Sequence, residues 1–211
     1  MESMAESENC IPKATLSRLP AYLRYLKGEA GKGVVFISSA SIAEDMKLSA
    51  ISVRKDLALV SAPGKPRMGF ELARLISDME NMLGYHCYAN AVVVGAGRLG
   101  RAILCYDGFE NYGIHVVAAF DNSPSKVGAL LGKPIYPVER LKEIVAREAI
   151  QKAIVTVPKE AAHEACNLLI DAGVRSILNF APTYLAVPEG VQIKCVDFAA
   201  MLATLGAPLS K

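Results

Sequence analysis

Three glycines at positions 95, 97 and 100 have the spacing that lets a polypeptide backbone hold a pyrophosphate. They follow the apolar run 91–94 and precede an apolar helix start at 101–104. In a strand, loop and helix of this kind, Gly95 permits the tight turn, Gly97 lets the backbone approach the phosphates and Gly100 lets the helix pack on the strand. The loop is therefore predicted to bind a dinucleotide through its six residues, Gly95, Ala96, Gly97, Arg98, Leu99 and Gly100.

An acidic residue follows at the distance that such a site requires. A second apolar strand, 116–120, ends in Asp121, which is 21 residues after Gly100. A carboxylate at this place accepts hydrogen bonds from the adenosine ribose hydroxyls and repels a 2′-phosphate. The spacing favours NAD and NADH over their phosphorylated forms. The alternative is a Rossmann domain that has lost its ligand.

Two further strand ends are expected beside the glycine loop. Apolar strands at 153–157 and 176–180 finish in Thr156-Val157-Pro158 and Asn179-Phe180-Ala181-Pro182. The alternation of strands and helices predicts a parallel, doubly wound sheet, whose ligand crevice lies outside the carboxyl ends of its strands. We expect both segments to line this crevice, with Phe180 and Pro182 as an apolar wall for a nicotinamide. Each could equally be a structural strand ending.

The chain has few candidate catalytic residues. None of its three histidines falls where a nicotinamide is expected except His163, and a helix-surface histidine without function is the more common case. The five cysteines are widely spaced and include no Cys-x-x-Cys pair, so neither a disulfide framework nor a metal site is indicated. We predict no catalytic residue and no metal, and hence a sensor rather than an enzyme.

Positive charge is concentrated before the dinucleotide motif. Residues 11–75 hold eleven Lys and Arg against five acids, although the whole chain has a net charge of only +2. A basic segment of this size fits a small nucleic-acid-binding module, and a solvated face is the alternative.

The apolar pattern of that segment is typical of a helix-turn-helix. It predicts a first helix that ends at Gly28 and a second that opens on a capping box formed by Ser41 and Glu44. A third helix follows, capped by Ser49, with Ile51, Val53 and Leu57 facing inward and with Arg54 and Lys55 facing outward. The stretch 61–70 then has the prolines and glycines of a hairpin wing around Lys65 and Arg67, before an amphipathic helix that stops at Gly84.

These observations define the fold class and the domains. We predict an α/β protein with a winged helix-turn-helix domain at 11–84 and a Rossmann-type, doubly wound parallel-sheet domain at 85–195. A flexible tail at 1–10 and a short C-terminal helix at 196–211 complete the chain. No apolar run reaches the roughly 18 residues of a membrane span, and the acidic start does not resemble a signal peptide, so we expect no membrane partner and a cytoplasmic location.

Seven stretches have the form of one known family. They are I-P-x-A-T-x-x-R-L-P-x-Y-L-R at 11–24, V-R-K-D-L at 53–57, G-A-G-R-L-G at 95–100, A-F-D at 119–121, T-V-P at 156–158, I-L-N-F-A-P at 177–182 and V-D-F at 196–198. Through them the chain resembles the Rex family of redox-sensing transcriptional repressors. The resemblance implies a homodimer that binds double-stranded operator DNA when NAD is abundant and releases it when NADH occupies the site.

The resemblance also implies roles for single residues. Arg24 and Asp197 would form a switchable ion pair, Tyr106 would lie near the nicotinamide, and Phe198 would contact it from the partner subunit, so that 196–211 lies at the dimer interface. Contacts with DNA would come from the recognition helix and the wing, through Ser49, Ser52, Arg54, Lys55, Lys65 and Arg67.

Three departures from the family pattern leave other functions open. Leu59 stands where the family has an aromatic DNA contact, Pro66 replaces a wing arginine while Arg67 replaces a neighbouring glycine, and the last helix is short. One alternative is a Rex-like NADH sensor that has lost DNA binding and acts through a protein partner. A further alternative is an NAD-dependent oxidoreductase.

Overall fold

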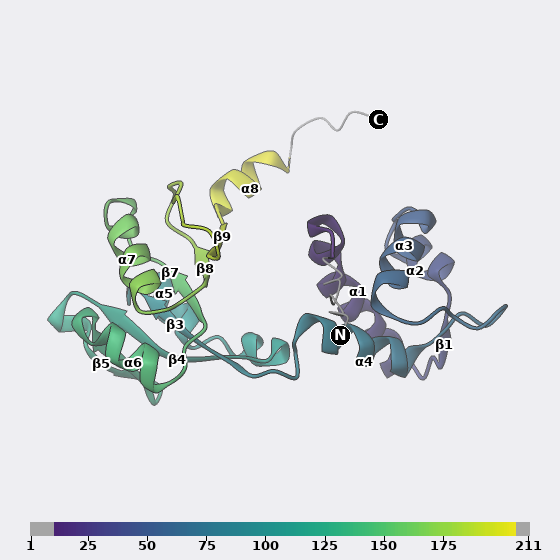
Figure 1. Cartoon of the computed structure of the whole chain (residues 1–211), viewed down its shortest axis with the longest axis horizontal. Coiled ribbons are helices and arrows are strands. Elements are labelled where there is room, and N and C mark those ends of the chain that lie inside the picture. The colour runs from purple at the N-terminus through teal and green to yellow at the C-terminus, as the bar shows by residue number, and fades with distance from the viewer. Residues whose placement is uncertain (1–10, 206–211) are drawn as a thin grey trace, which may run out of the picture. The chain divides into compact units, whose positions relative to one another are not determined.

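The computed structural model describes residues 11–205, which form two compact units divided between His86 and Cys87 (Figure 1). The tail predicted at 1–10 and the end of the C-terminal segment, 206–211, lie outside the described residues. No helix within the described range is long and apolar enough to cross a membrane.

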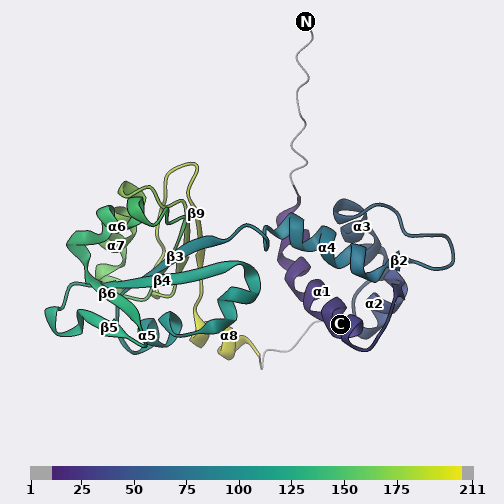
Figure 2. The same cartoon turned by 90° about the horizontal axis from the view of Figure 1, so that it is seen from below.

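The first unit consists of four helices and a two-stranded sheet. Its elements are α1 (Lys13–Gly31), β1 (Phe36–Ile37), α2 (Ser39–Asp45), α3 (Ala50–Val60), β2 (Phe70–Glu71) and α4 (Leu72–Leu83). Strands β1 and β2 are antiparallel, with Ile37 opposite Phe70. The core is built by apolar residues that all four helices bury, among them Leu19, Leu26, Ile42, Leu57 and Leu75. The loop from α3 to β2 projects from this helical body, as Figure 2 shows.

Two predicted helix boundaries in this unit were wrong. Helix α1 continues through Gly28 to Gly31, because one glycine costs a helix only about 1 kcal/mol while the turns around it stay packed. After the C-cap residue Lys32, the chain turns away at Gly33, whose φ of +83° suits glycine. Helix α2 begins earlier than expected, since the hydroxyl of Ser38 accepts a hydrogen bond from the Ser41 amide at 3.0 Å and caps the helix.

The second unit is built around a seven-stranded sheet. Its strands are β3 (Ala89–Val94), β4 (Ile114–Asp121), β5 (Gly128–Leu130), β6 (Lys133–Pro137), β7 (Lys152–Val155), β8 (Ser176–Asn179) and β9 (Gln192–Cys195). Their order in space is β5-β6-β4-β3-β7-β8-β9, so the chain reverses direction across the sheet at β3. All neighbours are parallel except β5, which pairs antiparallel with β6 at one edge. This edge hairpin was not predicted, because its residues show no apolar alternation.

Helices cover both faces of the sheet. They are α5 (Arg98–Leu104), α6 (Leu141–Arg147) and α7 (Lys159–Asp171), with short 3-10 turns at Asp107–Tyr112, Pro124–Lys126 and Val138–Arg140. Helix α8 (Phe198–Thr204) follows β9 and has no buried residue. Helices α6 and α7 pack on the face that carries Val92 and Val94, and α5 packs on the face that carries Ala91 and Val93. Because both faces are covered, β3 is apolar and buried from Ala91 to Val94, and its carboxyl end opens directly into the glycine loop.

Candidate functional site

The three glycines of the loop after β3 meet different surroundings. Gly95 has a φ of +103°, which permits the turn out of the strand. A Cβ atom added at Gly100 would lie 1.8 Å from the Gly95 carbonyl oxygen, so the first turn of α5 packs against the loop only because this residue has no side chain. A Cβ added at Gly97 would have no atom within 4 Å. The open side of Gly97 is therefore space that the fold itself does not use.

Asp121, at the end of β4, holds this loop in place. Its Oδ2 atom accepts a hydrogen bond from the Ala96 amide at 2.7 Å, and its Oδ1 atom accepts one from the Ser123 amide at 2.9 Å. Lys126 Nζ lies 3.0 Å from Oδ2 and 3.2 Å from Oδ1. Burial of Asp121 would raise its pKa, but these hydrogen bonds to its charged form lower the pKa below the ordinary value.

Thr156, after β7, braces the loop from the other side. Its hydroxyl donates to the Gly95 carbonyl oxygen at 2.8 Å, and its amide donates to the Val94 carbonyl oxygen at 2.8 Å. The side chain that we expected to line the crevice therefore points at the glycine loop. It shapes the crevice by fixing the loop.

A cavity of about 570 Å³ opens beside these residues. Of the predicted cofactor residues, it is lined by Gly95, Gly97, Asp121, Thr156, Val157 and Pro158. Its size lies within the range of small-molecule and cofactor pockets. At the free side of Gly97, a phosphate can approach the backbone, and the ionised Asp121 can accept hydrogen bonds from a ribose. A dinucleotide requires both features in one cavity. The residues present therefore fit such a ligand.

Other predicted cofactor residues lie outside the lining of this cavity. Asn179 is fully buried, and its side-chain amide bonds to the backbone of Ala181 and Thr183, so it stabilises the loop after β8. The Phe180 ring packs against Phe198 with 5.2 Å between the ring centroids.

Three more of these residues are exposed. Tyr106 is 60% exposed and packs edge-on against Phe109. Arg98 and Leu99 lie exposed on the first turn of α5.

Several residues that line the cavity belong to no recognisable sequence pattern. Lys126 comes from the 3-10 turn after β4, and Val138 from the turn after β6. Helix α7 contributes Ala161, Glu164, Ala165 and Leu168 from one face. These residues belong to no motif, and only the packing of α7 on the sheet brings them to the glycine loop.

In the first unit, helix α3 presents polar and basic side chains to solvent. Ser49 stands at the N-cap position, but its hydroxyl accepts no hydrogen bond from the helix amides, so the predicted side-chain cap is not formed. Ser52, Arg54 and Lys55 are exposed. The prediction that Ile51 faces inward was wrong, because this side chain is 60% exposed. Residues 51 and 53 are separated by about 200° around a helix, and Val53 is the one that is buried.

A buried ionic cluster fixes α3 against α1. Asp56 is 2% exposed and accepts hydrogen bonds from the Thr15 hydroxyl, the Tyr22 hydroxyl and the Arg18 guanidinium at 2.7–2.8 Å. Burial alone would raise the pKa of Asp56, but the hydrogen bonds lower it below its ordinary value. Burial and the neighbouring carboxylate raise the pKa of Tyr22 to about 12. Every donor of this cluster lies on α1, so the cluster sets the orientation of the helix that carries Arg54 and Lys55.

The predicted wing is a tight hairpin with its cations at and near the tip. Lys65 and Gly69 pair through two backbone hydrogen bonds, of 2.7 and 2.9 Å, and Arg67 between them has a φ of +64°. A Cβ at Gly69 would lie 2.3 Å from the Ile37 carbonyl oxygen, which shows how closely the hairpin packs on β1.

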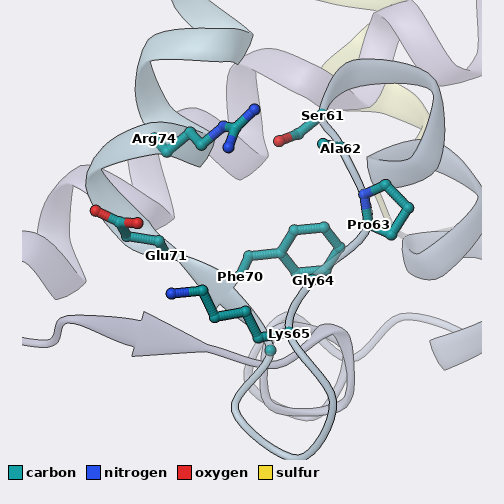
Figure 3. Close-up of a pocket in the computed structure, with 9 residues that line it drawn as sticks. Ser61, Ala62, Pro63, Gly64, Lys65, Phe70, Glu71 and Arg74 are labelled. Atoms are coloured by element: carbon teal, nitrogen blue, oxygen red, sulfur yellow. The ribbon is translucent and has the colours of Figure 1, made fainter.

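A small pocket of about 60 Å³ opens at the base of this hairpin. Lys65 and Glu71 are among the residues that line it. In Figure 3 the Arg74 side chain extends from α4 toward Ser61 across this pocket, which adds a cation that the sequence analysis did not single out.

Comparison with known proteins identifies the family. Residues 88–183 match the CoA binding domain, and residues 10–58 match the family described as "Putative DNA-binding protein N-terminus". The redox-sensing transcriptional repressor Rex of Carboxydothermus hydrogenoformans is 39% identical to the chain over 196 residues, which cover 92% of this chain and 94% of that protein. The Rex repressor of Desulfitobacterium hafniense is 40% identical over 196 residues, 92% of this chain and 93% of its own. The chain belongs to the Rex family.

Solved structures of a Rex-family repressor named RSP have the same fold. RSP in complex with NAD⁺ and operator DNA superposes with a TM-score of 0.89 at 31% identity, covering 93% of this chain and 91% of RSP. RSP in complex with NADH gives a TM-score of 0.84 at 31% identity over 92% of each chain. The predicted winged helix-turn-helix followed by a Rossmann-type sheet is thereby confirmed.

The two residues that the Rex resemblance assigns to a switch have separate surroundings. Arg24 is exposed on α1. Asp197 is exposed and caps α8, because its Oδ1 atom accepts a hydrogen bond from the Ala200 amide at 3.0 Å. The Asp197 carboxylate therefore already has a role within its own unit.

Proposed function

We propose that this Rex-family chain is a transcriptional repressor that binds operator DNA and releases it when NADH replaces NAD. The observation that carries the proposal is the presence, in one chain, of a dinucleotide cavity with an open Gly97 and of an exposed α3 that carries Arg54 and Lys55. The relative RSP has been crystallised with NAD⁺ and operator DNA and, separately, with NADH. Cofactor state would thus set the affinity for DNA.

The proposed residue roles follow the geometry. Gly95, Gly97 and Asp121 bind the pyrophosphate and the adenosine ribose, while Val157 and Pro158 line the same cavity. Bound NAD or NADH is read as a signal, and the described residues need only bind and orient it. None of the three histidines lines the cavity, which supports a sensor rather than an oxidoreductase.

A homodimer and a cytoplasmic site of action complete the proposal. Helix α8 leaves Phe198, Met201 and Leu202 between 59% and 70% exposed, an apolar face that a second copy of the chain would cover. Phe198 would then reach the nicotinamide of the partner subunit. Both the DNA and the dinucleotide pool that such a regulator needs are cytoplasmic.

The test is a binding titration of the full chain on duplex DNA. Fluorescence anisotropy with duplexes selected from a random pool is expected to show tight binding with NAD, weaker binding with NADH, and affinity that falls steeply with salt. A chain that binds NADH but no duplex would contradict the repressor. It would support the alternative in which the sensor acts through a protein partner, for which the exposed Leu59 on α3 is the favouring observation.

A further inference from the structure

The outer face of α3 carries an apolar side chain that the fold does not use. Ile51 is the second residue of this helix and is 60% exposed. The opposite face meets the core through Val53, Leu57 and Val60, each at most 9% exposed. Ile51 therefore contributes little to the packing of the first unit and is available for a contact outside the chain.

The neighbours of Ile51 indicate what that contact is. Arg54 and Lys55 follow it at i+3 and i+4 and so lie beside it on the same face. The single acid of the helix, Asp56, is buried in its cluster with α1. The outer face of α3 therefore combines two cations and no anion with one branched apolar group near the N-terminal end of the helix. This charge pattern is complementary to a polyanion.

The major groove of DNA offers one apolar group to such a face, the 5-methyl group of thymine. In helix-turn-helix proteins, the N-terminal residues of the recognition helix contact the base edges. We propose that Ile51 is a specificity-determining residue that recognises a thymine by packing on its methyl group, while Arg54 and Lys55 contact phosphates or guanine. This inference rests on the proposed binding of operator DNA.

The test removes the Ile51 side chain and the thymine methyl group, first separately and then together. An operator is first selected from a random duplex pool with the full chain and NAD, and each thymine of one half-site is then replaced in turn by deoxyuridine, which lacks only the methyl group. The wild-type chain is expected to lose about fourfold in affinity at one thymine, the change that burial of one methyl group produces. Ile51→Ala should bind the thymine and deoxyuridine duplexes equally at that position.

A matched control uses Leu59, the other large apolar residue that is exposed on this helix. Leu59 is 44% exposed and lies about 12 Å further along the axis, so Leu59→Ala should keep the wild-type cost at the same thymine. The inference is overturned if Ile51→Ala loses as much affinity as the wild type at every thymine replaced by deoxyuridine. It is also overturned if no such replacement lowers the affinity of the wild type. In both cases operator binding stands. If selection enriches no duplex, both the inference and the proposed repressor fail.

Discussion

The carboxylate of Asp121 accepts a hydrogen bond from the Ala96 amide at 2.7 Å, which joins the end of β4 to the middle of the glycine loop. A residue expected to recognise the ribose is thus also a structural brace of the loop that would hold the pyrophosphate. Lys126 partly offsets its charge from 3.0 Å away.

Asp121→Asn is expected to weaken NADH binding by roughly tenfold, because a charged acceptor is lost from a buried network. It should also narrow the preference for NADH over NADPH, since the negative charge that repels a 2′-phosphate is gone. Lys126→Met is the matched variant and should widen that preference. Calorimetric titration with both dinucleotides checks this, and an unchanged ratio in both variants would contradict the assignment of Asp121 to the ribose.

Two glycine variants are expected to separate folding from binding. Gly100→Ala should destabilise the second unit, because its Cβ would overlap the Gly95 carbonyl oxygen. Gly97→Ala should keep the thermal unfolding midpoint of the wild type and lose dinucleotide affinity, because its Cβ meets no protein atom and occupies the phosphate approach. Thermal unfolding and NADH titration measure the two effects. Wild-type NADH affinity in Gly97→Ala would exclude this loop as the pyrophosphate site.

Asp56→Asn is expected to lower the free energy of unfolding of the first unit by about 3 kcal/mol, because it breaks a buried ionic cluster. The folded-state pKa of Asp56 is lowered, so its contribution is complete above the ordinary carboxyl pKa of about 4 and is lost as pH falls through the folded value. The free energy of unfolding that urea titration measures for the wild type should therefore fall below about pH 4, and that of Asp56→Asn should fall less.

The second unit provides the internal reference for that measurement. Its unfolding transition should be the same in Asp56→Asn and in the wild type, because Asp56 contacts residues of α1 only within the first unit. If the unfolding transition of the first unit has the same pH dependence in both proteins, the cluster does not stabilise this unit through its charge.

Arg54→Ala and Lys55→Ala are each expected to reduce the slope of log affinity for DNA against log salt by about one, if each side chain neutralises one phosphate. Arg147→Ala, which removes a cation from α6 in the other unit, should leave the slope unchanged. Anisotropy titrations at several salt concentrations give the slopes. Slopes equal to that of the wild type in both α3 variants would show that α3 does not contact phosphate.

Arg24→Ala is expected to leave NADH affinity intact and to make DNA affinity insensitive to NADH, if the proposed pair with Asp197 operates. Asp197→Asn tests the same pair from the other side, because asparagine caps a helix as well as aspartate does and should preserve α8. DNA titrations with NAD and with NADH measure the coupling. Normal NADH release in both variants would rule out this ion pair as the switch.

Features that depend on local spacing could be predicted from the amino-acid sequence. The glycines at 95, 97 and 100, the acid at 121 and the cations at 54 and 55 lie where the sequence pattern placed them. A strand that enters a tight turn, or a helix with one apolar face, is specified by residues within a few positions of each other. The fold class and the loop of the candidate cofactor site followed from such patterns.

Contacts between residues far apart in the chain became visible only in the folded structure. The bonds of Asp56 with Thr15 and Arg18 span 41 and 38 residues, and the bond of Thr156 with Gly95 spans 61. No local pattern encodes such pairs, because they form only when separate helices and strands pack. Ile51 is a different case, because it lies about 200° around α3 from Val53, so helical periodicity alone already separates it from the buried stripe of Val53, Leu57 and Val60.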